Sequence, residues 1–210
     1  MKDINQAILK LKAGGVIIFP TETLYGLGAS ALDEKAVQRI YQIKKRSENK
    51  PFPVIIGEPS QLDMLLEDTS NAILEFIKKK FWPGPLSVVL PGRKNLPRQI
   101  LSNRGLICVR YTSHPIARKL CLLSGFPLVA TSANISGASP PKNFNDISCE
   151  LIQKVDYVLK LGPSPKGAAP STIIRFLNEN TVEIIREGAI SSTHLKSAGL
   201  NIVIKQRRPF

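Results

Sequence analysis

Cysteine and histidine are scarce in this sequence, which has three cysteines and two histidines among 210 residues. Cys108, Cys121 and Cys149 are widely spaced and form no Cys-x-x-Cys pair, and only His114 and His194 could join them. The sequence therefore supports neither a disulfide scaffold nor a zinc site.

Long hydrophobic runs are also missing. No apolar run approaches the roughly 20 residues of a membrane-spanning helix, and the N-terminus from Met1 to Asn5 lacks the apolar core of a signal peptide. We therefore expect a cytoplasmic protein with no membrane partner. The length suits one large domain, because typical domains have about 50–250 residues.

Acidic residues are outnumbered, since 16 Asp and Glu stand against 29 Lys and Arg and the formal charge is +13. Such an excess favours partners that carry phosphate and speeds association with them. The charge alone does not distinguish a nucleotide from an RNA or a lipid.

Familiar catalytic and nucleotide-binding motifs are missing as well, including Gly-x-Gly-x-x-Gly and the Gly-x-x-x-x-Gly-Lys-Ser/Thr phosphate loop. His114 precedes Pro115 at a predicted helix start, where capping or packing is expected and not base catalysis. Trp82 suits the core or a pocket wall, and Glu22 is the one carboxylate in a candidate site. Chemistry would then rest on cations and hydroxyls, which act by positioning and charge neutralisation.

The spacing of apolar residues predicts an α/β fold with one mixed sheet flanked by helices, since strands near the C-terminus lack intervening helices. Glycines, prolines and capping residues delimit the elements. Helices are predicted between Asp3 and Gly14, from Asp33 to the cations at Lys44–Arg46, from Thr69 or Ser70 to before Phe81, and near His114–Leu123 and Asp146–Lys154. Strands are predicted at Val16–Phe19, Val54–Ile56, Leu86–Leu90, Leu106–Arg110, Leu128–Thr131, Tyr157–Leu159, Ser171–Phe176 and Val182–Arg186.

Four cations lie together in Lys44-Lys45-Arg46-Ser47-Glu48-Asn49-Lys50-Pro51, at the end of a predicted helix and just before Val54–Ile56. Such donors could hold a polyanion such as a nucleotide. They could also complement the helix dipole and cap its free carbonyls, and this second interpretation is favoured on the feature alone.

Hydroxyl, amide and glycine residues follow several predicted strands, and strand ends of this kind are where α/β sheets bind ligands. Ser, Thr and Asn also cap turns routinely, which is the favoured interpretation for Ala130–Gly137 taken alone. The loops 136–142 and 162–170 are candidate binding loops that could equally be disordered. The four segments are Pro20–Gly28, Ala130–Gly137, Pro170–Ile174 and Ile184–Gly188.

Seven motifs, in this order, resemble the YrdC/Sua5 family, and specifically its short single-domain members. Together they run from about Gly15 to Gly188 and are far more specific than any one of them. The motifs are Pro20-Thr-Glu-Thr-Leu-Tyr-Gly-Leu-Gly28, Lys44-x-Arg46-x-x-x-Lys50-Pro51, Trp82-Pro-Gly-Pro-Leu86, Val109-Arg110 with His114-Pro115, Thr131-Ser-Ala-Asn134, Ser171-Thr-Ile-Ile174 and Arg186-x-Gly188.

The resemblance implies a twisted open α/β sheet around a central basic cavity, with a YrdC-like catalytic domain over residues 1–190 and a short C-terminal extension over 191–210. It implies threonylcarbamoyl-AMP synthase activity, in which L-threonine, bicarbonate or CO₂, and ATP give threonylcarbamoyl-adenylate and pyrophosphate. Mg²⁺ is expected through the ATP phosphates, and no metal ligand is assigned. The product would serve t6A modification of tRNA next to the anticodon, through transferase machinery of the TsaD/TsaB/TsaE type, and direct contact with tRNA or RNA is left open.

By the same resemblance, the candidate site residues fall into three sets, with Lys45 expected to point to solvent. Threonine would be held by Thr23, Arg110, Ala130 and Ser171. The nucleotide would be held by Arg46, Lys50, Ser132, Asn134 and Arg186. The catalytic cations, which would converge on the phosphates, are Lys44, Arg46 and Lys50.

Three features depart from the family pattern. Ile55 stands where some members have histidine, and Ser47 follows Arg46 where proline is common. Only Ala189–Phe210 follow the last motif, so the extra domain of longer Sua5 members is not expected. The basic segment 205–210 is expected to be solvated.

Two rival hypotheses remain at this point. A non-catalytic module of the same fold could bind double-stranded RNA or tRNA through its positive charge, but it would have no use for a pocket made by Thr23, Ser132 and Ser171. The carbamoyl-transferring YrdC-like domain of hydrogenase maturation proteins is disfavoured, because those chains add acylphosphatase and zinc-finger regions for which the length and the cysteine count leave no room.

Overall fold

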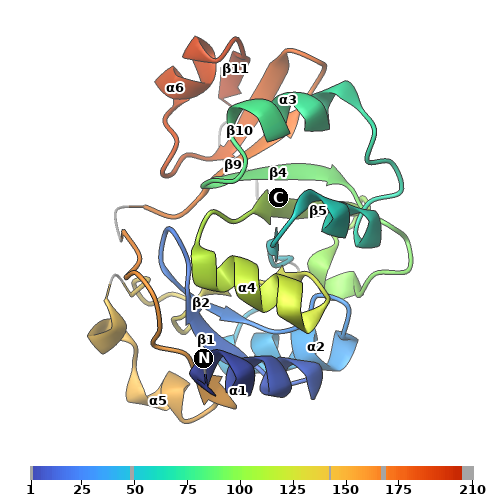
Figure 1. Cartoon of the computed structure of the whole chain (residues 1–210). Coiled ribbons are helices and arrows are strands. Elements are labelled where there is room, and N and C mark those ends of the chain that lie inside the picture. Colours follow the sequence, from blue (N-terminus) through green and yellow to red (C-terminus); the bar gives the residue numbers. More distant parts are fainter. Residues whose placement is uncertain (1, 48–49, 142, 167–168, 205–210) are drawn as a thin grey trace.

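Two mixed β-sheets form the frame of the computed structural model, which describes residues 2–47, 50–141, 143–166 and 169–204 (Figure 1). The strands are β1 (Ile17–Pro20), β2 (Tyr25–Gly28), β3 (Val54–Ile56), β4 (Leu86–Pro91), β5 (Leu106–Tyr111), β6 (Leu128–Val129), β7 (Thr131–Ser132), β8 (Tyr157–Val158), β9 (Thr172–Phe176), β10 (Thr181–Arg186) and β11 (Asn201–Ile204). The smaller sheet has the order β7-β2-β1-β8, and the larger has the order β11-β10-β9-β4-β5-β3-β6. The predicted α/β class with mixed pairing is confirmed, but the expectation of one sheet is wrong.

The two sheets meet where the chain passes from β6 to β7. Because β6 pairs with β3 and β7 pairs with β2, the single strand predicted at Leu128–Thr131 is divided between the sheets. The backbone N–H of Ala130, between the two strands, donates to the carbonyl of Pro53 at 3.0 Å, and that of Val129 donates to Ala29 at 2.9 Å. Backbone hydrogen bonds therefore set the relative position of the sheets at this junction.

Strand β2 is absent from the sequence-based expectation because two of its four residues are glycines, which disfavour strands. It pairs antiparallel with β1 along its whole length. A Cβ on Gly28 would lie 2.0 Å from the carbonyl oxygen of Val129. Glycine is required there because the backbones of β2 and β6 approach each other so closely.

The helices flank the sheets, with α1 and α4 packed against each other on one face (Figure 1). Ile4, Ile8 and Leu11 are buried on α1 as their helical spacing predicts. The helices that were predicted are α1 (Lys2–Lys12), α2 (Glu34–Lys44), α3 (Ala72–Lys80), α4 (Pro115–Ser124) and α5 (Cys149–Ile152). Short 3₁₀ helices lie at Pro59–Met64, Arg98–Ile100 and Phe144–Asp146.

Two helix starts differ from the prediction because other side chains provide the caps. Asn71, and neither Thr69 nor Ser70, caps α3 by accepting from the N–H of Leu74 at 2.9 Å. Ser148 caps a short α5, while Asn143 and Asp146 form a reciprocal capping box on the preceding 3₁₀ helix. The single helix predicted at Asp146–Lys154 is therefore shorter than expected.

The segment after residue 190 adds α6 (Ser192–Ser197) and β11, neither of which was predicted. Strand β11 pairs parallel with β10 as the outer strand of the larger sheet, and Leu195 and Leu200 are buried in the main core. The division of the chain at residue 190 stays a prediction. The basic segment 205–210 lies outside the described residues.

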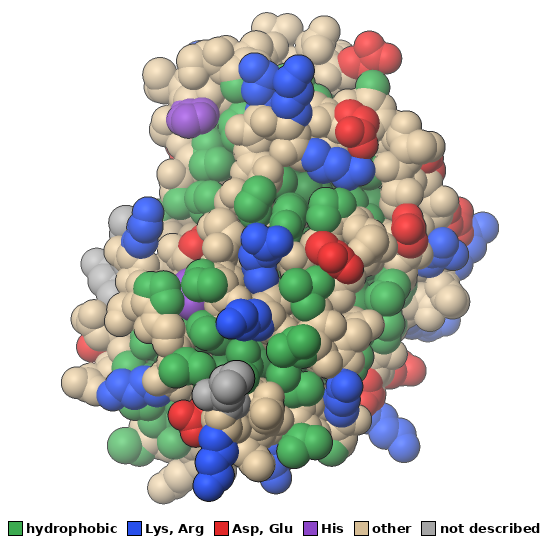
Figure 2. Space-filling view, in the orientation of Figure 1, with side chains coloured by type: hydrophobic (Ala, Val, Ile, Leu, Met, Phe, Trp, Pro, Cys, Tyr) green, Lys and Arg blue, Asp and Glu red, His purple; other side chains and the backbone are tan. Residues whose placement is uncertain are grey.

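Within the described part of the chain, no helix is long and apolar enough to span a bilayer. Figure 2 shows Lys and Arg side chains spread over the face that it displays, among hydrophobic ones, and not gathered into a single patch.

Candidate active site

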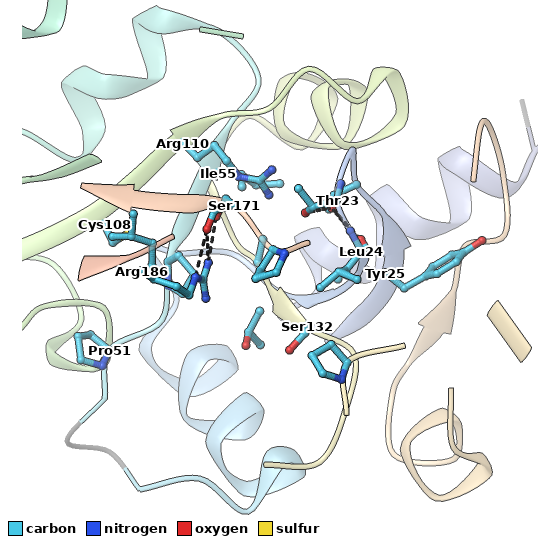
Figure 3. A pocket seen from close by; sticks show the side chains of 18 of the residues that line it. Thr23, Leu24, Tyr25, Pro51, Ile55, Cys108, Arg110, Ser132, Ser171 and Arg186 are labelled. Carbon is cyan, nitrogen blue, oxygen red and sulfur yellow. Dashed lines mark hydrogen bonds between the residues drawn. The ribbon is translucent and has the colours of Figure 1, made fainter. Parts of the chain in front are cut away.

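A cavity of about 290 Å³ opens at the junction of the two sheets (Figure 3). The β1–β2 turn, β3, β5, the β6–β7 crossing and the ends of β9 and β10 all contribute to its wall. No Asp or Glu is among the described residues that line it. Of the ten predicted site residues, eight line this cavity: Thr23, Arg46, Lys50, Arg110, Ala130, Ser132, Ser171 and Arg186.

The turn between β1 and β2 presents Thr23 to the cavity. The hydroxyl of Thr21 donates to the carbonyl of Leu24 at 2.7 Å and accepts from the N–H groups of Thr23 and Leu24 at 3.3 Å each. The hydroxyls of Thr21 and Thr23 are also hydrogen-bonded, at 3.1 Å. One buried hydroxyl therefore closes the turn and holds the Thr23 hydroxyl in place.

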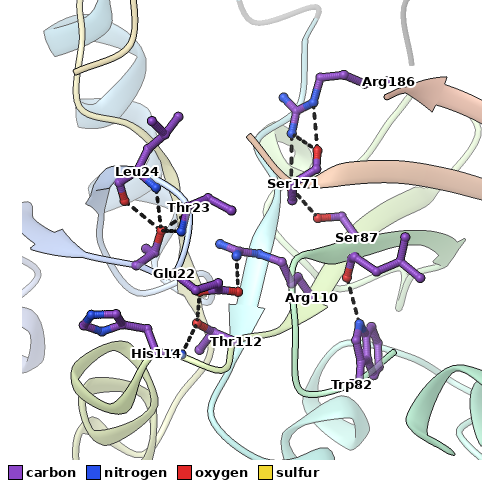
Figure 4. Close-up of polar contacts among 12 residues, drawn as sticks. Glu22, Thr23, Leu24, Trp82, Ser87, Arg110, Thr112, His114, Ser171 and Arg186 are labelled. Carbon is purple, nitrogen blue, oxygen red and sulfur yellow. Dashed lines mark hydrogen bonds and ion pairs between the residues drawn. The ribbon is translucent and has the colours of Figure 1, made fainter. Parts of the chain in front are cut away.

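Arg110 lies on β5, in register with Ile55 of β3, and its guanidinium is held by Glu22 (Figure 4). Nη1 of Arg110 donates to Oε1 of Glu22, and the hydroxyl of Thr112 donates to Oε2 at 2.6 Å. Burial raises the pKa of Glu22, but the charge of Arg110 and the hydrogen bond from Thr112 outweigh it, so the net pKa lies below its usual range. Glu22 is therefore an anion that compensates the charge of Arg110.

Arg186 and Ser171, predicted for different substrates, are in direct contact. Nε and Nη2 of Arg186 donate to the carbonyl of Ser171 at 3.1 and 2.8 Å, and Nη2 also donates to its hydroxyl at 3.1 Å (Figure 4). The hydroxyl of Ser87 lies 2.9 Å from that of Ser171 and completes the buried cluster. Burial lowers the pKa of Arg186, and the nearby charges of Arg110 and Arg46 lower it further.

Arg46 and Lys50, from the segment that follows α2, also line the cavity. The guanidinium of Arg46 lies over the ring of Phe52, 5.0 Å from its centroid, and burial lowers its pKa. Its Nε is buried without a hydrogen-bond partner among the described residues. The backbone of Lys50 is fixed by Tyr41, whose hydroxyl donates to the Lys50 carbonyl at 2.8 Å, while its side chain is exposed. A buried donor without a partner is rare, so the hydrogen bonding of Arg46 is incomplete although its side chain lines the cavity.

Lys44 departs from the expectation that it converges with Arg46 and Lys50 on one ligand. It is 2% exposed, does not line the cavity, and its Nζ donates to the carbonyls of Ser132 and Asn134 at 2.6 Å each. Burial and the charge of Arg46 lower its pKa to about 7. Lys44 is in the last turn of α2, and its side chain extends toward the segment 132–134. The backbone carbonyls of that segment accept the hydrogen bonds of its ammonium group. Lys45 is exposed, as predicted.

Asn134 is the second predicted residue that does not line the cavity. Its Oδ1 accepts from the hydroxyl of Ser132 at 2.5 Å, and its Nδ2 donates to the carbonyl of Ala138 at 2.6 Å. The amide is therefore occupied in shaping the turn that carries Ser132. Lys44 and Asn134 both support a wall of the cavity instead of forming it.

Several residues of the site escaped the sequence reasoning. Thr21 and Cys108 line the cavity, Ser87 supports Ser171, and Glu22 was noted without its partner Arg110. Cys108 is fully buried, which raises the pKa of its thiol to about 12 and leaves it unreactive. Strand alternation could have indicated both, because Cys108 shares a face of β5 with Arg110, and Ser87 is the one polar residue of β4.

The departures noted in the sequence have structural counterparts. Ile55, where some family members have histidine, gives the cavity an apolar wall beside Arg110. His114 caps α4, since its Nδ1 accepts from the N–H of Ile116 at 3.3 Å, and its Nε2 therefore donates to the carbonyl of Pro163 at 3.0 Å. The expected capping role of His114 is confirmed. Among the described residues, no group of three or more His, Cys, Asp or Glu could hold a metal ion.

Comparison with known proteins identifies the family to which this chain belongs. A family model for Sua5, YciO and YrdC, described as telomere recombination, matches residues 10–188. The chain belongs to the Sua5/YciO/YrdC family.

Individual relatives from this family are similar over most of the chain. A threonylcarbamoyl-AMP synthase of Pyrococcus abyssi is 38% identical over 86% of this chain and 52% of its own length. One from Idiomarina loihiensis is 36% identical over 90% of this chain and 100% of its own length. A crystal structure of P. abyssi Sua5 complexed with L-threonine matches with a TM-score of 0.87 and 34% identity, over 95% of this chain and 58% of that one. The chain thus spans about half of the P. abyssi relative and all of the I. loihiensis one.

Proposed function

We propose that this chain is a threonylcarbamoyl-AMP synthase, which makes threonylcarbamoyl-adenylate and pyrophosphate from L-threonine, bicarbonate or CO₂, and ATP. One observation carries the proposal. A single cavity brings together threonine and serine hydroxyls and the cations Arg46, Lys50, Arg110 and Arg186, from segments far apart in the sequence. The names of the relatives, and the L-threonine in the P. abyssi structure, support the same activity.

Threonine would occupy the end of the cavity formed by β5 and the β1–β2 turn. The guanidinium of Arg110 suits a carboxylate, because its planar fork of donors matches the two oxygens. The hydroxyls of Thr23 and Ser171 and the backbone beside Ala130 would complete the site. The hydroxyl of Thr23 is held by Thr21, so it would meet the substrate with little loss of side-chain entropy.

ATP would occupy the end formed by Arg46, Lys50, Ser132 and Arg186. Asn134 belongs to this part of the site through the turn that it shapes, and Lys44 acts in the same way, by holding the carbonyls of Ser132 and Asn134. Mg²⁺, expected with ATP, would be held by the phosphates of the nucleotide, because the described lining offers hydroxyls and cations but no carboxylates.

The reaction needs positioning and charge neutralisation. The amine of threonine forms an N–C bond with CO₂ and loses a proton, which yields a carbamate anion. A carbamate oxygen then attacks the α-phosphorus, the bond to the β-phosphate oxygen breaks, and pyrophosphate leaves. No general base is needed for this transfer, because the carbamate is already anionic. Arg46 and Lys50 would neutralise the charge that grows on the phosphate oxygens.

The product is an activated mixed anhydride, which must pass its threonylcarbamoyl group to an acceptor. We place the chain in t6A formation on tRNA next to the anticodon, in the cytoplasm, with a transferase of the TsaD/TsaB/TsaE type downstream. Direct contact with RNA is a separate question, which a binding measurement with tRNA would answer. A module that only bound RNA would have no use for a cavity lined by Thr23, Ser132 and Ser171, so the cavity favours the synthase.

Pyrophosphate release tests the proposal directly. The purified chain is incubated with ATP and Mg²⁺, with and without threonine and bicarbonate, and pyrophosphate is measured. Release should require both co-substrates, and the adenylate should appear in the same samples by mass spectrometry. Release that ignores threonine and bicarbonate would overturn the assignment.

Arg46→Ala should lower kcat by about 100-fold or more, because it removes a preorganised cation from the developing phosphate charge. Lys45→Ala is the matched control, since Lys45 is the neighbouring cation but is exposed and does not line the cavity. Circular dichroism should show that both variants are folded. Equal activity of Arg46→Ala and Lys45→Ala would remove Arg46 from the catalytic set.

A further inference from the structure

Glu22 lies behind the cavity and not on its surface. Its neighbours Thr21 and Thr23 line the cavity, but Glu22 does not, and its side chain is 9% exposed. The carboxylate is directed at Arg110 and at the hydroxyl of Thr112, which follows the same strand (Figure 4). Glu22 therefore contacts Arg110 on β5 and Thr112 just after that strand, while it does not line the cavity itself.

Arg110 uses one side of its guanidinium for Glu22. Nη1 donates to the carboxylate, whereas Nη2 and Nε have no recorded partner among the described residues and are not buried unpaired atoms. Since Arg110 lines the cavity, these remaining donors have access to it. An arginine held from behind by one nitrogen presents a fixed set of N–H groups in front.

We propose that Glu22 is the positioning residue of the threonine site: it anchors Nη1 of Arg110, and so turns the remaining N–H groups of that arginine toward the carboxylate of the amino-acid substrate. The inference rests on the proposed function and deepens it. Glu22 would lower the KM for threonine without touching threonine.

The charge of Glu22 also helps to decide which substrate binds at Arg110. Arg46, Lys50, Arg110 and Arg186 all line one cavity, and a triphosphate would attract any of them. Glu22 compensates Arg110 alone, since it is the one glutamate paired with a cavity arginine among the described residues. The positive potential at Arg110 is therefore lower than at Arg46, Lys50 and Arg186, which have no such partner in the described part of the chain. The triphosphate is attracted more strongly to those three cations, and Arg110 remains available for the carboxylate of threonine. Without Glu22, threonine binding should weaken and ATP binding should stay the same or become tighter.

Kinetics and binding of Glu22→Gln and Glu22→Ala test this inference. With Glu22→Ala, the KM for threonine should rise by about tenfold or more, the loss expected for one charge-assisted contact, while the KM for ATP does not rise. Glu22→Gln can still accept one hydrogen bond from Arg110 and should fall between wild type and Glu22→Ala. Titration calorimetry with threonine in the absence of ATP should show the same order of affinities.

Glu183→Gln is the matched control, because Glu183 is also buried and paired with an arginine, Arg175, but lies outside the cavity. It should leave the KM for threonine unchanged. In an Arg110→Ala background, removal of Glu22 should have no further effect on threonine binding, because Glu22 acts through Arg110.

Three results would overturn the inference: an unchanged KM for threonine in both Glu22 variants, an equal rise in the KM for ATP, or additive losses in the double variant with Arg110→Ala. Should Glu22→Ala fail to fold, Glu22→Gln decides, because it keeps the shape and one acceptor. The wild-type titration separates this outcome from failure of the proposed function. Wild-type protein that binds no threonine contradicts the function, whereas wild-type binding that Glu22→Gln leaves intact contradicts only the role of Glu22.

Discussion

Lys44 and Lys45 are adjacent in the sequence, but the first is buried and the second is exposed. Residue 44 is in the last turn of α2 and residue 45 is its cap in the left-handed conformation, so the two side chains leave the backbone in different directions. One donates to buried carbonyls and the other forms an exposed ion pair with Glu150. The sequence could indicate that this cluster serves a site. It could not say that Lys44 is a buried support, because that depends on the β6–β7 crossing 88 residues later.

The lowered pKa of Lys44 makes the stability of the fold depend on pH. Its pKa is about 7 in the folded chain, against 10.5 for an ordinary lysine. Between these values the unfolded chain binds more protons, so stability should rise as pH increases from 7 toward 10, at up to about 1.4 kcal/mol per pH unit. Below pH 7 this gain is absent, because Lys44 is protonated in both states.

Lys44→Met tests this dependence, because it keeps an unbranched side chain that is only one atom shorter and removes the titrating amine. Urea unfolding at pH 7 and pH 9 should show that the wild-type free energy of unfolding rises more than that of the variant. The variant will be less stable at both values, since it leaves two carbonyls unsatisfied. Only the difference in slope bears on the pKa, and parallel slopes would contradict it.

At the scale of elements, α2 ends in an unfavourable backbone conformation. Lys45 has φ 51° and ψ 45°, and among the described residues it is the only one other than glycine with positive φ. This conformation costs a residue with a Cβ about 1 kcal/mol or more. The turn lets the carbonyl of Lys44 accept from the N–H of Ser136 at 2.9 Å, so it connects α2 to the loop beside the cavity.

Lys45→Gly should therefore stabilise the fold by up to about 1 kcal/mol, because glycine adopts the left-handed conformation without strain. The variant also loses the Lys45–Glu150 ion pair, at 3.1 Å, which is exposed and contributes little. Lys45→Ala loses the same pair but keeps the strain, so it should be less stable than Lys45→Gly by about 1 kcal/mol. Chemical denaturation measures both, and equal stability of the two variants would count against strain at this cap.

Strand prediction succeeded where burial is simple and failed where backbones cross. Val54–Ile56 was predicted with its observed bounds, because three successive buried aliphatic residues are typical of an interior strand. β2 was missed, since the glycines that permit its close approach to β6 also remove the apolar signal. The same crossing divides Leu128–Thr131 between two sheets. The local sequence pattern does not reveal that the chain leaves one sheet and joins the other within two residues.

At the scale of the whole molecule, the cavity exists because two sheets meet, and the sequence reasoning expected one. Eight of the ten predicted residues still line this one cavity, because motifs such as Thr131–Asn134 and Ser171–Ile174 mark the ends of strands whichever sheet those strands join. The supporting contacts could not be predicted. The Glu22–Arg110 pair and the Ser87–Ser171 hydrogen bond join residues 88 and 84 positions apart, and no local pattern links them.

The C-terminal residues 191–204 are expected to unfold together with the rest of the described chain. Leu195 on α6 is fully buried in the main core, and the hydroxyl of Thr172, on the strand beside the cavity, donates to the carbonyl of Ile190 at 2.6 Å. Leu195→Ala should therefore lower the free energy of unfolding by about 2–5 kcal/mol, the cost of a buried leucine. The exposed Leu177 offers a control, since Leu177→Ala should change it by no more than about 0.5 kcal/mol.

A single unfolding transition should shift as a whole in Leu195→Ala, because α6 packs on β11, and β11 belongs to the larger sheet that also carries Arg110 and Arg186. Thermal unfolding followed by circular dichroism, compared with loss of pyrophosphate release over the same temperatures, measures this. At temperatures where the variant is fully folded, its kcat should equal that of wild type, since Leu195 does not line the cavity. If an early transition left activity intact, residues 191–204 would instead form an appendage that unfolds independently of the catalytic sheet.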